Sequence, residues 1–174
     1  MIRRPLMPAS YELYLIRQGI AETRGEAWPE DAKRPLTEDG MTRLRKSARA
    51  LARMGVSIDI VLTSPFVRTR QTAEIIAAAF NPRPSLVNVD VLTPGGTPSA
   101  LAAELEKHSR RPRMAIVGHE PGIGELAAWL VGMKHPIEFK KGAVCRIDVE
   151  SLPPRGAGNL RWLLQPKILR NLKK

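Results

Sequence analysis

The chain has 174 residues, of which 43% are apolar and 26% are charged, and it carries a net charge of +11. Its length fits a single domain over residues 1–174. No run approaches the ~20 apolar residues of a membrane-spanning helix, and the basic N-terminus lacks the apolar stretch of a secretory signal. The one cysteine, Cys145, forms no internal disulfide and lies in an apolar run typical of a buried strand. We therefore expect a cytoplasmic protein with a full core.

The excess positive charge gathers at the two ends. Residues 1–10 and 166–174 hold six basic and no acidic residues, and we expect both segments to be basic tails. Such tails could bind nucleic acid or anionic lipid with an affinity that falls steeply with salt. Only 5% of residues are aromatic, so platforms for stacking bases are scarce. We therefore expect no specific nucleic-acid binding, and rank tail binding third among the candidate functions.

In chain order, the first elements alternate between strand and helix. The apolar run 11–16 predicts a strand, and the polar segment 20–36 predicts a loop over the sheet edge. Thr37 is a good helix N-cap, and the helix it opens should end at Gly55. The β-branched run 58–63 then predicts a buried strand.

The second half continues the alternation and ends differently. We expect a helix over 67–80, a strand over 86–91, and a helix that opens at Thr97-Pro98 and runs to about His108. After these we expect a strand over 114–117 and a helix from 122 onward. Two closing strands follow, over 142–149 and 159–165. The alternation indicates an α/β fold, a three-layer α/β/α sandwich with a mainly parallel sheet and an antiparallel finish.

Three polar clusters follow predicted strands. They are Arg17-Gln18-Gly19, the segment from Ser64 to Arg70, and Gly118-His119-Glu120. Ligands of parallel sheets bind beyond the carboxyl ends of the strands, so we expect the clusters to converge on one site.

The residue types in these clusters suit a phosphoryl group. Arg17 and Arg68 offer planar, permanently charged forks for phosphate oxygens, and His119 precedes a predicted helix whose N-terminus favours anions. His108 and His135 lack such a setting, and we assign them structural roles. The clusters lack metal-ligand spacing, so we expect no metal and no cofactor.

Four segments resemble the histidine phosphatase superfamily, and within it the SixA-type phosphohistidine phosphatases. In the family's order these are 13–22 with its Arg-Gln-Gly, 34–40, 62–72 and 116–122 with its Gly-His-Glu-Pro-Gly. Each is short, but together they span about residues 11–165.

The resemblance implies a role for each site residue. Arg17 and Arg68 would clamp the phosphoryl oxygens, and His119 would donate a hydrogen bond to the phosphate. Position 18 would be the nucleophilic histidine, which accepts the phosphoryl group before water releases it. Glu120 and Glu22 are the candidate proton donors.

This chain has Gln18 where the family has its nucleophile. An amide nitrogen shares its lone pair with the carbonyl, so it donates hydrogen bonds but does not attack phosphorus. The sequence is compatible with a natural loss of the histidine and with an introduced change.

Two functions therefore compete. The first is a SixA-like phosphohistidine or phosphomonoester phosphatase with lost or impaired hydrolysis; the second is a pseudophosphatase that only binds phosphate or a phosphorylated protein. Short segments between the motifs predict an open site, which favours a phosphorylated side chain, such as phosphohistidine, presented by a partner protein.

Overall fold

A six-stranded sheet forms the centre of the molecule. The computed structural model describes residues 10–172, and its strands lie in the order β3-β2-β4-β1-β5-β6. β3, β2, β4 and β1 are parallel, whereas β5 and β6 are antiparallel to their neighbours. The strands are β1 (Tyr11–Arg17), β2 (Ile60–Thr63), β3 (Ser85–Asn88), β4 (Arg113–Gly118), β5 (Val144–Val149) and β6 (Asn159–Leu164).

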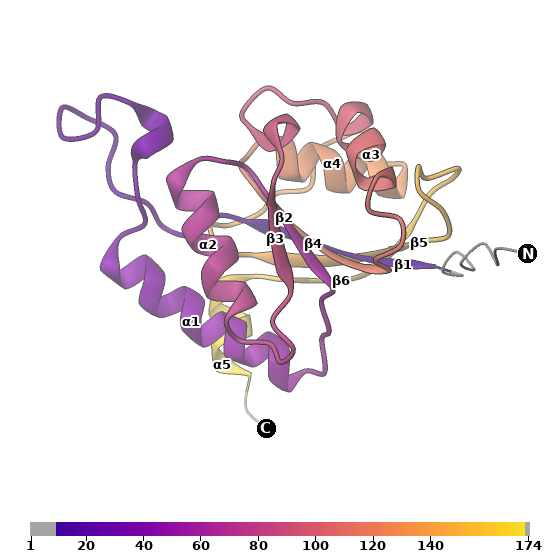
Figure 1. Cartoon of the computed structure of the whole chain (residues 1–174), viewed down its shortest axis with the longest axis horizontal. Helices are drawn as coiled ribbons and strands as arrows, with labels where there is room; N and C mark the ends of the chain where they lie inside the picture. The colour runs from indigo at the N-terminus through magenta and orange to yellow at the C-terminus, as the bar shows by residue number, and fades with distance from the viewer. Residues whose placement is uncertain (1–9, 173–174) are drawn as a thin grey trace, which may run out of the picture.

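Helices cover both faces of the sheet, which confirms the predicted three layers (Figure 1). One face carries α1 (Glu38–Arg53), α2 (Val67–Ala77) and α5 (Pro166–Asn171), and the other carries α3 (Pro98–Glu106) and α4 (Gly122–Val131). Two 3-10 turns complete the described elements, η1 (Asp31–Lys33) and η2 (Asp90–Leu92).

The central strand β1 divides its side chains between two cores. Leu13 and Leu15 belong to the core beneath α3 and α4, whereas Tyr14 and Ile16 belong to the core beneath α1, α2 and α5. This alternation follows from the two-residue period of a strand, and burial on both faces explains why the run 11–16 is almost wholly apolar. Cys145 is buried in β5, as predicted.

The predicted starts of α1 and α3 and the predicted end of α1 are confirmed, whereas α3 ends at Glu106, two residues before the predicted end. Thr37 Oγ1 accepts a hydrogen bond of 2.9 Å from the Gly40 amide, and Gly55 takes the left-handed conformation (φ 77°) just beyond the helix. Thr97 Oγ1 accepts in the same way from the Ala100 amide at 3.3 Å. These local side-chain signals therefore position both helices.

Some predicted ends were wrong by a few residues. The strand expected over 86–91 ends at Asn88 because Asp90–Leu92 form a 3-10 turn, in which the Asp90 carbonyl accepts from both the amide and the hydroxyl of Thr93. The helix expected to reach residue 80 ends at Ala77, ahead of Asn81-Pro82.

The expected basic tail at 166–174 is wrong for its first six residues. They form α5, which packs against α1, and Leu169 is 0% exposed in the core. The buried Leu169 side chain anchors this segment on the core, although the residues around it are rich in charge. The tail expected at 1–10 lies almost entirely outside the described residues. Within residues 10–172, no helix combines the length and apolarity that crossing a membrane requires.

We predict that Leu169→Ala lowers the free energy of unfolding by about 2–5 kcal/mol, because it empties a buried site. Its neighbour Ile168 is 55% exposed on the same helix, so Ile168→Ala serves as the matched control and should change stability by less than about 0.5 kcal/mol. Urea unfolding of the three proteins measures both values. Equal effects of the two changes would contradict the anchoring role of Leu169.

Candidate functional site

The ends of β1, β4 and β2 meet at one edge of the sheet. Arg17 is in register with Gly118, and Thr63 is in register with Val117, so the residues that follow these three strands lie side by side. They enclose a cleft of about 280 Å³. Its lining includes the residues that the sequence singled out, namely Arg17, Gln18, Arg68, His119 and Glu120.

Helix α2 is held against the end of β1 by a short hydrogen-bond chain. The Gly19 amide donates to Thr72 Oγ1 at 3.1 Å, and the Thr72 hydroxyl donates to the Arg68 carbonyl at 2.7 Å. A Cβ on Gly19 would lie 2.5 Å from Cδ1 of Leu44 and 3.3 Å from Cδ2 of Leu36. Position 19 therefore accepts only glycine without repacking, and the hydrogen-bond chain through Thr72 links this glycine to the backbone of Arg68.

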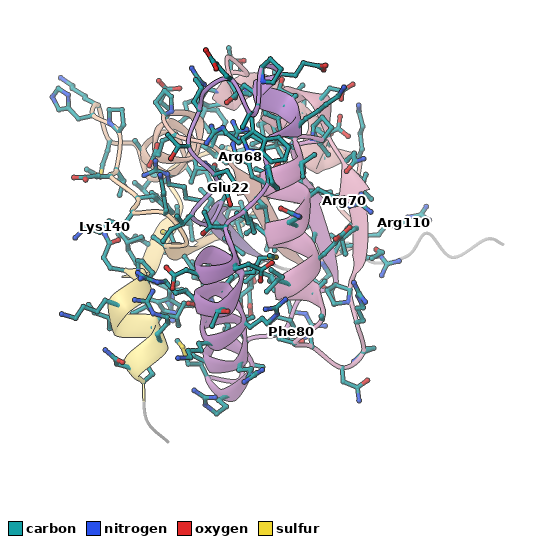
Figure 2. The ribbon with its side chains drawn as sticks, turned by 90° about the vertical axis from the view of Figure 1, so that its left-hand side faces the viewer. Glu22, Arg68, Arg70, Phe80, Arg110 and Lys140 are labelled. Carbon is teal, nitrogen blue, oxygen red and sulfur yellow. The ribbon has the colours of Figure 1, made fainter. Side chains whose placement is uncertain are left out.

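Arg68 is only 3% exposed and is held by one residue of the long loop. Its Nη1 donates to the Asp31 carbonyl at 2.7 Å, and its Nη2 pairs with Asp31 Oδ2 at 2.9 Å. The guanidinium also lies 5.0 Å from the centre of the Phe66 ring. Figure 2 shows Arg68 beneath this loop, at the top of the molecule. Two hydrogen bonds to one residue fix the orientation of the fork.

Asp31 was missed by the sequence analysis, although it organises the positive charges of the cleft. Its carboxylate also pairs with Arg34 at 2.8 Å and Arg24 at 3.1 Å. Burial alone would raise the pKa of Asp31, but the hydrogen bond from Arg34 and the charge of Arg68 lower it to about 2. Asp31 thus remains ionised at neutral pH. The only sequence signal for it was an acidic residue close to Arg34, in a segment that the sequence predicts as a loop and the structure forms partly as the 3-10 turn η1.

His119 is 6% exposed and enters the cleft from the end of β4. Its Nε2 lies 3.0 Å from Ser64 Oγ, and its ring meets Phe66 edge-on with 5.1 Å between the ring centres. Burial, followed by the charge of Arg68, lowers the pKa of His119 to about 4. The imidazole is therefore neutral at pH 7. When the Ser64 hydroxyl donates to Nε2, the ring proton sits on Nδ1.

Arg17 and Glu120 are joined through the backbone of Phe139. Arg17 Nη1 donates to the Phe139 carbonyl at 2.6 Å, and the Phe139 amide donates to Glu120 Oε1 at 2.9 Å. The Gly124 amide donates to the other oxygen of Glu120 at 3.2 Å. Burial raises the pKa of Glu120 above its ordinary value, although the hydrogen bonds from the Phe139 and Gly124 amides act in the opposite direction. By contrast, Glu22 does not line the cleft.

Four residues of the cleft carry a buried polar atom that makes no hydrogen bond within the described structure. These atoms are Arg17 Nε, Gln18 Oε1, Arg68 Nε and His119 Nδ1. Buried polar atoms are satisfied in most proteins, so four at one place call for an explanation. The two arginine Nε atoms are donors, and His119 Nδ1 is a third donor when it carries the ring proton. An anion with several oxygens is the ligand class that matches these donors, whereas Gln18 Oε1 is an acceptor.

Charge points to the same ligand class. Five cationic side chains line the cleft, three of which were not among the predicted site residues, Arg24, Arg34 and Lys141. In the part of the chain that the structure describes, the acidic residues of the lining are Asp31 and Glu120 alone. Within residues 10–172 no cluster of three or more His, Cys, Asp or Glu side chains could hold a metal ion. The groups that the cleft offers an anion are therefore arginine, lysine and imidazole.

Known proteins share this fold and much of this sequence. The family model of the histidine phosphatase superfamily (branch 1) matches residues 13–91. An uncharacterized protein of Picosynechococcus sp. is 41% identical over 138 residues, which are 76% of this chain and 82% of that protein. The phosphohistidine phosphatase SixA of Escherichia coli is 29% identical over 164 residues, which are 93% of this chain and 98% of the relative.

A solved structure agrees with these sequence matches. The protein histidine phosphatase SixA complexed with tungstate superposes with a TM-score of 0.80 at 27% identity, and the match covers 90% of this chain and 97% of that one. The chain therefore belongs to the histidine phosphatase superfamily, as a member of its SixA type.

The lowered pKa of His119 predicts how stability depends on pH. The folded state resists protonation while the unfolded chain takes up a proton below the ordinary pKa of 6.5. The contribution of neutral His119 is therefore complete above pH 6.5 and is lost as the pH falls toward about 4, at up to ~1.4 kcal/mol per pH unit. Urea unfolding at several pH values should show a shallower decline in His119→Gln than in the unchanged protein.

The exposed His135 provides the matched control for this measurement. His135→Gln should leave the decline unchanged, whereas an identical decline in all three proteins would contradict the role given to His119. Asp31 titrates in a lower window, because its contribution is present above its ordinary pKa of 3.8 and is lost as the pH falls through about 2. The two contributions therefore separate along the pH axis.

Proposed function

We propose that this protein binds a phosphoryl group in the cleft through Arg17, Arg68 and His119, and that Gln18 leaves its hydrolysis slow or absent. The observation that carries the proposal is the set of unpaired buried atoms on those three residues and on Gln18. Two arginine Nε–H donors, joined by imidazole Nδ1–H when that nitrogen carries the ring proton, suit the oxygens of a tetrahedral anion.

Gln18 changes the chemistry that the cleft supports without removing its charge. The side chain is 8% exposed, and its Oε1 is an acceptor. It would accept a hydrogen bond from a P–OH group of a protonated phosphoryl ligand, but it offers no lone pair for attack on phosphorus. His119 does not replace the nucleophile, because its Nε2 is engaged with Ser64. Binding and turnover are thus separable in this site.

We favour a phosphorylated side chain of a partner protein as the ligand, and phosphohistidine as its first candidate. The relative from Escherichia coli is named for activity on phosphohistidine. The cleft is bordered by the loop 20–36 and by Pro94, and its rim carries exposed Arg24 and Lys141. Charges on an exposed rim suit a ligand that remains attached to a larger surface. Cytoplasmic location is part of this proposal.

Titration with inorganic phosphate tests the binding step. We expect saturable binding by calorimetry and a loss of about tenfold to hundredfold in affinity in Arg17→Gln, the cost of one charged hydrogen-bonding partner. Arg49 is an exposed residue of α1 that does not line the cleft, so Arg49→Gln should bind like the unchanged protein. No saturable binding, or equal binding by all three, would overturn the proposal.

Restoring the family residue tests the turnover step. Gln18→His should raise the hydrolysis of phosphoramidate, a substrate with a P–N bond, by about 10⁴-fold. It should also give an acid-labile, base-stable phosphoenzyme, because the imidazole nitrogen takes the phosphoryl group and the leaving nitrogen takes a proton. The unchanged chain should show neither signal.

Gln18→Ala serves as the control for loss of the amide alone. It should remain as slow as the unchanged chain, since neither side chain is a nucleophile. If the unchanged chain already hydrolyses phosphoramidate as fast as Gln18→His, Gln18 does not limit turnover and this part of the proposal fails.

A further inference from the structure

A second hollow adjoins the cleft and is lined by positive charge. It has a volume of about 360 Å³ and lies between the start of α1, the segment 140–142 and the start of α5. We call it the basic groove. Among the described residues no carboxylate lines it, and six cationic residues do, namely Arg17, Arg43, Lys140, Lys141, Lys167 and Arg170. Figure 2 shows Lys140 above α5, at the left of the view.

Most of these charges have no partner within the described residues. Arg43 pairs with Asp39 at 2.7 Å, but no ion pair is formed there by Lys140, Lys141, Lys167 or Arg170. Like charges gathered without counter-charges repel one another and cost stability. Such a cluster is therefore explained by an anionic ligand rather than by the stability of the fold.

The basic groove is continuous with the phosphoryl cleft. Arg17 and Lys141 line both hollows. The hollow on the other side of His119, by contrast, has a lining without lysine or arginine that includes Glu120 and Glu125. Of these two neighbouring hollows, the basic groove is the positively charged one, and an extended anionic ligand would lie in it.

We infer that the basic groove binds an acidic segment of the same partner protein that presents its phosphorylated side chain to the cleft. The inference rests on the proposed function, which it deepens by naming the chemistry that flanks the phosphoryl group. Lysine ammonium groups act as point charges and accept carboxylates in many geometries, as a peptide of variable sequence requires. Leu44, Ile20 and Pro166 supply apolar lining for the carbon chains of such side chains.

The same lining disfavours the other polyanions. Within residues 10–172 no aromatic side chain lines the basic groove, so this part of the chain offers no stacking platform for nucleic-acid bases there. The hollow is concave between two helices, whereas the headgroup layer of a membrane is flat. An acidic peptide strand fits both the shape and the charge.

Two peptides test the inference. Each carries a hydrolysis-resistant phosphonate analogue of phosphohistidine, flanked on both sides by runs of glutamate in one and of glutamine in the other. We expect the unchanged protein to bind the glutamate peptide about tenfold tighter at ~0.05 M salt, with the preference shrinking as salt rises. The double variant Lys140→Glu/Lys167→Glu should lose the preference and bind the glutamine peptide as before.

A matched double variant controls for net charge. Lys46 and Lys134 are exposed and line neither hollow, so Lys46→Glu/Lys134→Glu changes the net charge equally and should keep the preference. Thermal melting of both variants verifies that they are folded. If the control variant also loses the preference for the glutamate peptide, the preference comes from the net charge of the protein, and the inference of a local binding groove is overturned.

The remaining outcomes separate this inference from the proposed function. If the protein binds both peptides with equal affinity and also binds inorganic phosphate, the inference about the basic groove is overturned and the proposed function stands. Absence of binding to both peptides and to inorganic phosphate overturns the proposed function itself. Duplex DNA or phosphatidylserine vesicles that bind the unchanged protein and not the Lys140→Glu/Lys167→Glu variant, without any peptide preference, would assign the groove to those polyanions.

Discussion

The parallel pairing of β1 with β4 is the constraint on which the site depends. Both strands are buried on two faces, and their register sets Arg17 opposite Gly118. A slip by one residue would exchange the side chains of Leu15 and Ile16 between the two cores, so the register is strongly determined. The first polar residues beyond the strands are consequently held where the apolar core ends. Packing in the core thereby fixes the geometry of the cleft.

The parts of this structure that could be predicted from the sequence are those set by local signals. Apolar runs marked the central strands, and Thr37 and Thr97 marked two helix starts, so the three polar clusters could be assigned to one sheet edge. Asp31 could not be found in this way, because its contact with Arg68 spans 37 residues and comes from a loop without periodicity. Helix α5 was missed because its one buried residue, Leu169, is flanked by Lys167 and Arg170.

The side chains of Arg17, Arg68 and His119 are held in place by contacts that do not depend on the residue at position 18. Arg68 is fixed by Asp31, Arg17 by the Phe139 carbonyl, and His119 by Ser64. None of these contacts involves the side chain of Gln18. An exchange at position 18 therefore leaves the electrostatic environment in place, and the same scaffold is compatible with a binding protein and with an enzyme.

The two ends of the described chain lie in different surroundings. Tyr11 begins β1 at the amino edge of the sheet, opposite the edge that carries the cleft, and pairs there with Val149. Helix α5, at the other end of the chain, forms one wall of the basic groove. A fusion partner or an immobilising linker placed ahead of β1 would leave both hollows accessible. The same attachment after α5 would sit beside Lys167 and Arg170 and compete with incoming anions.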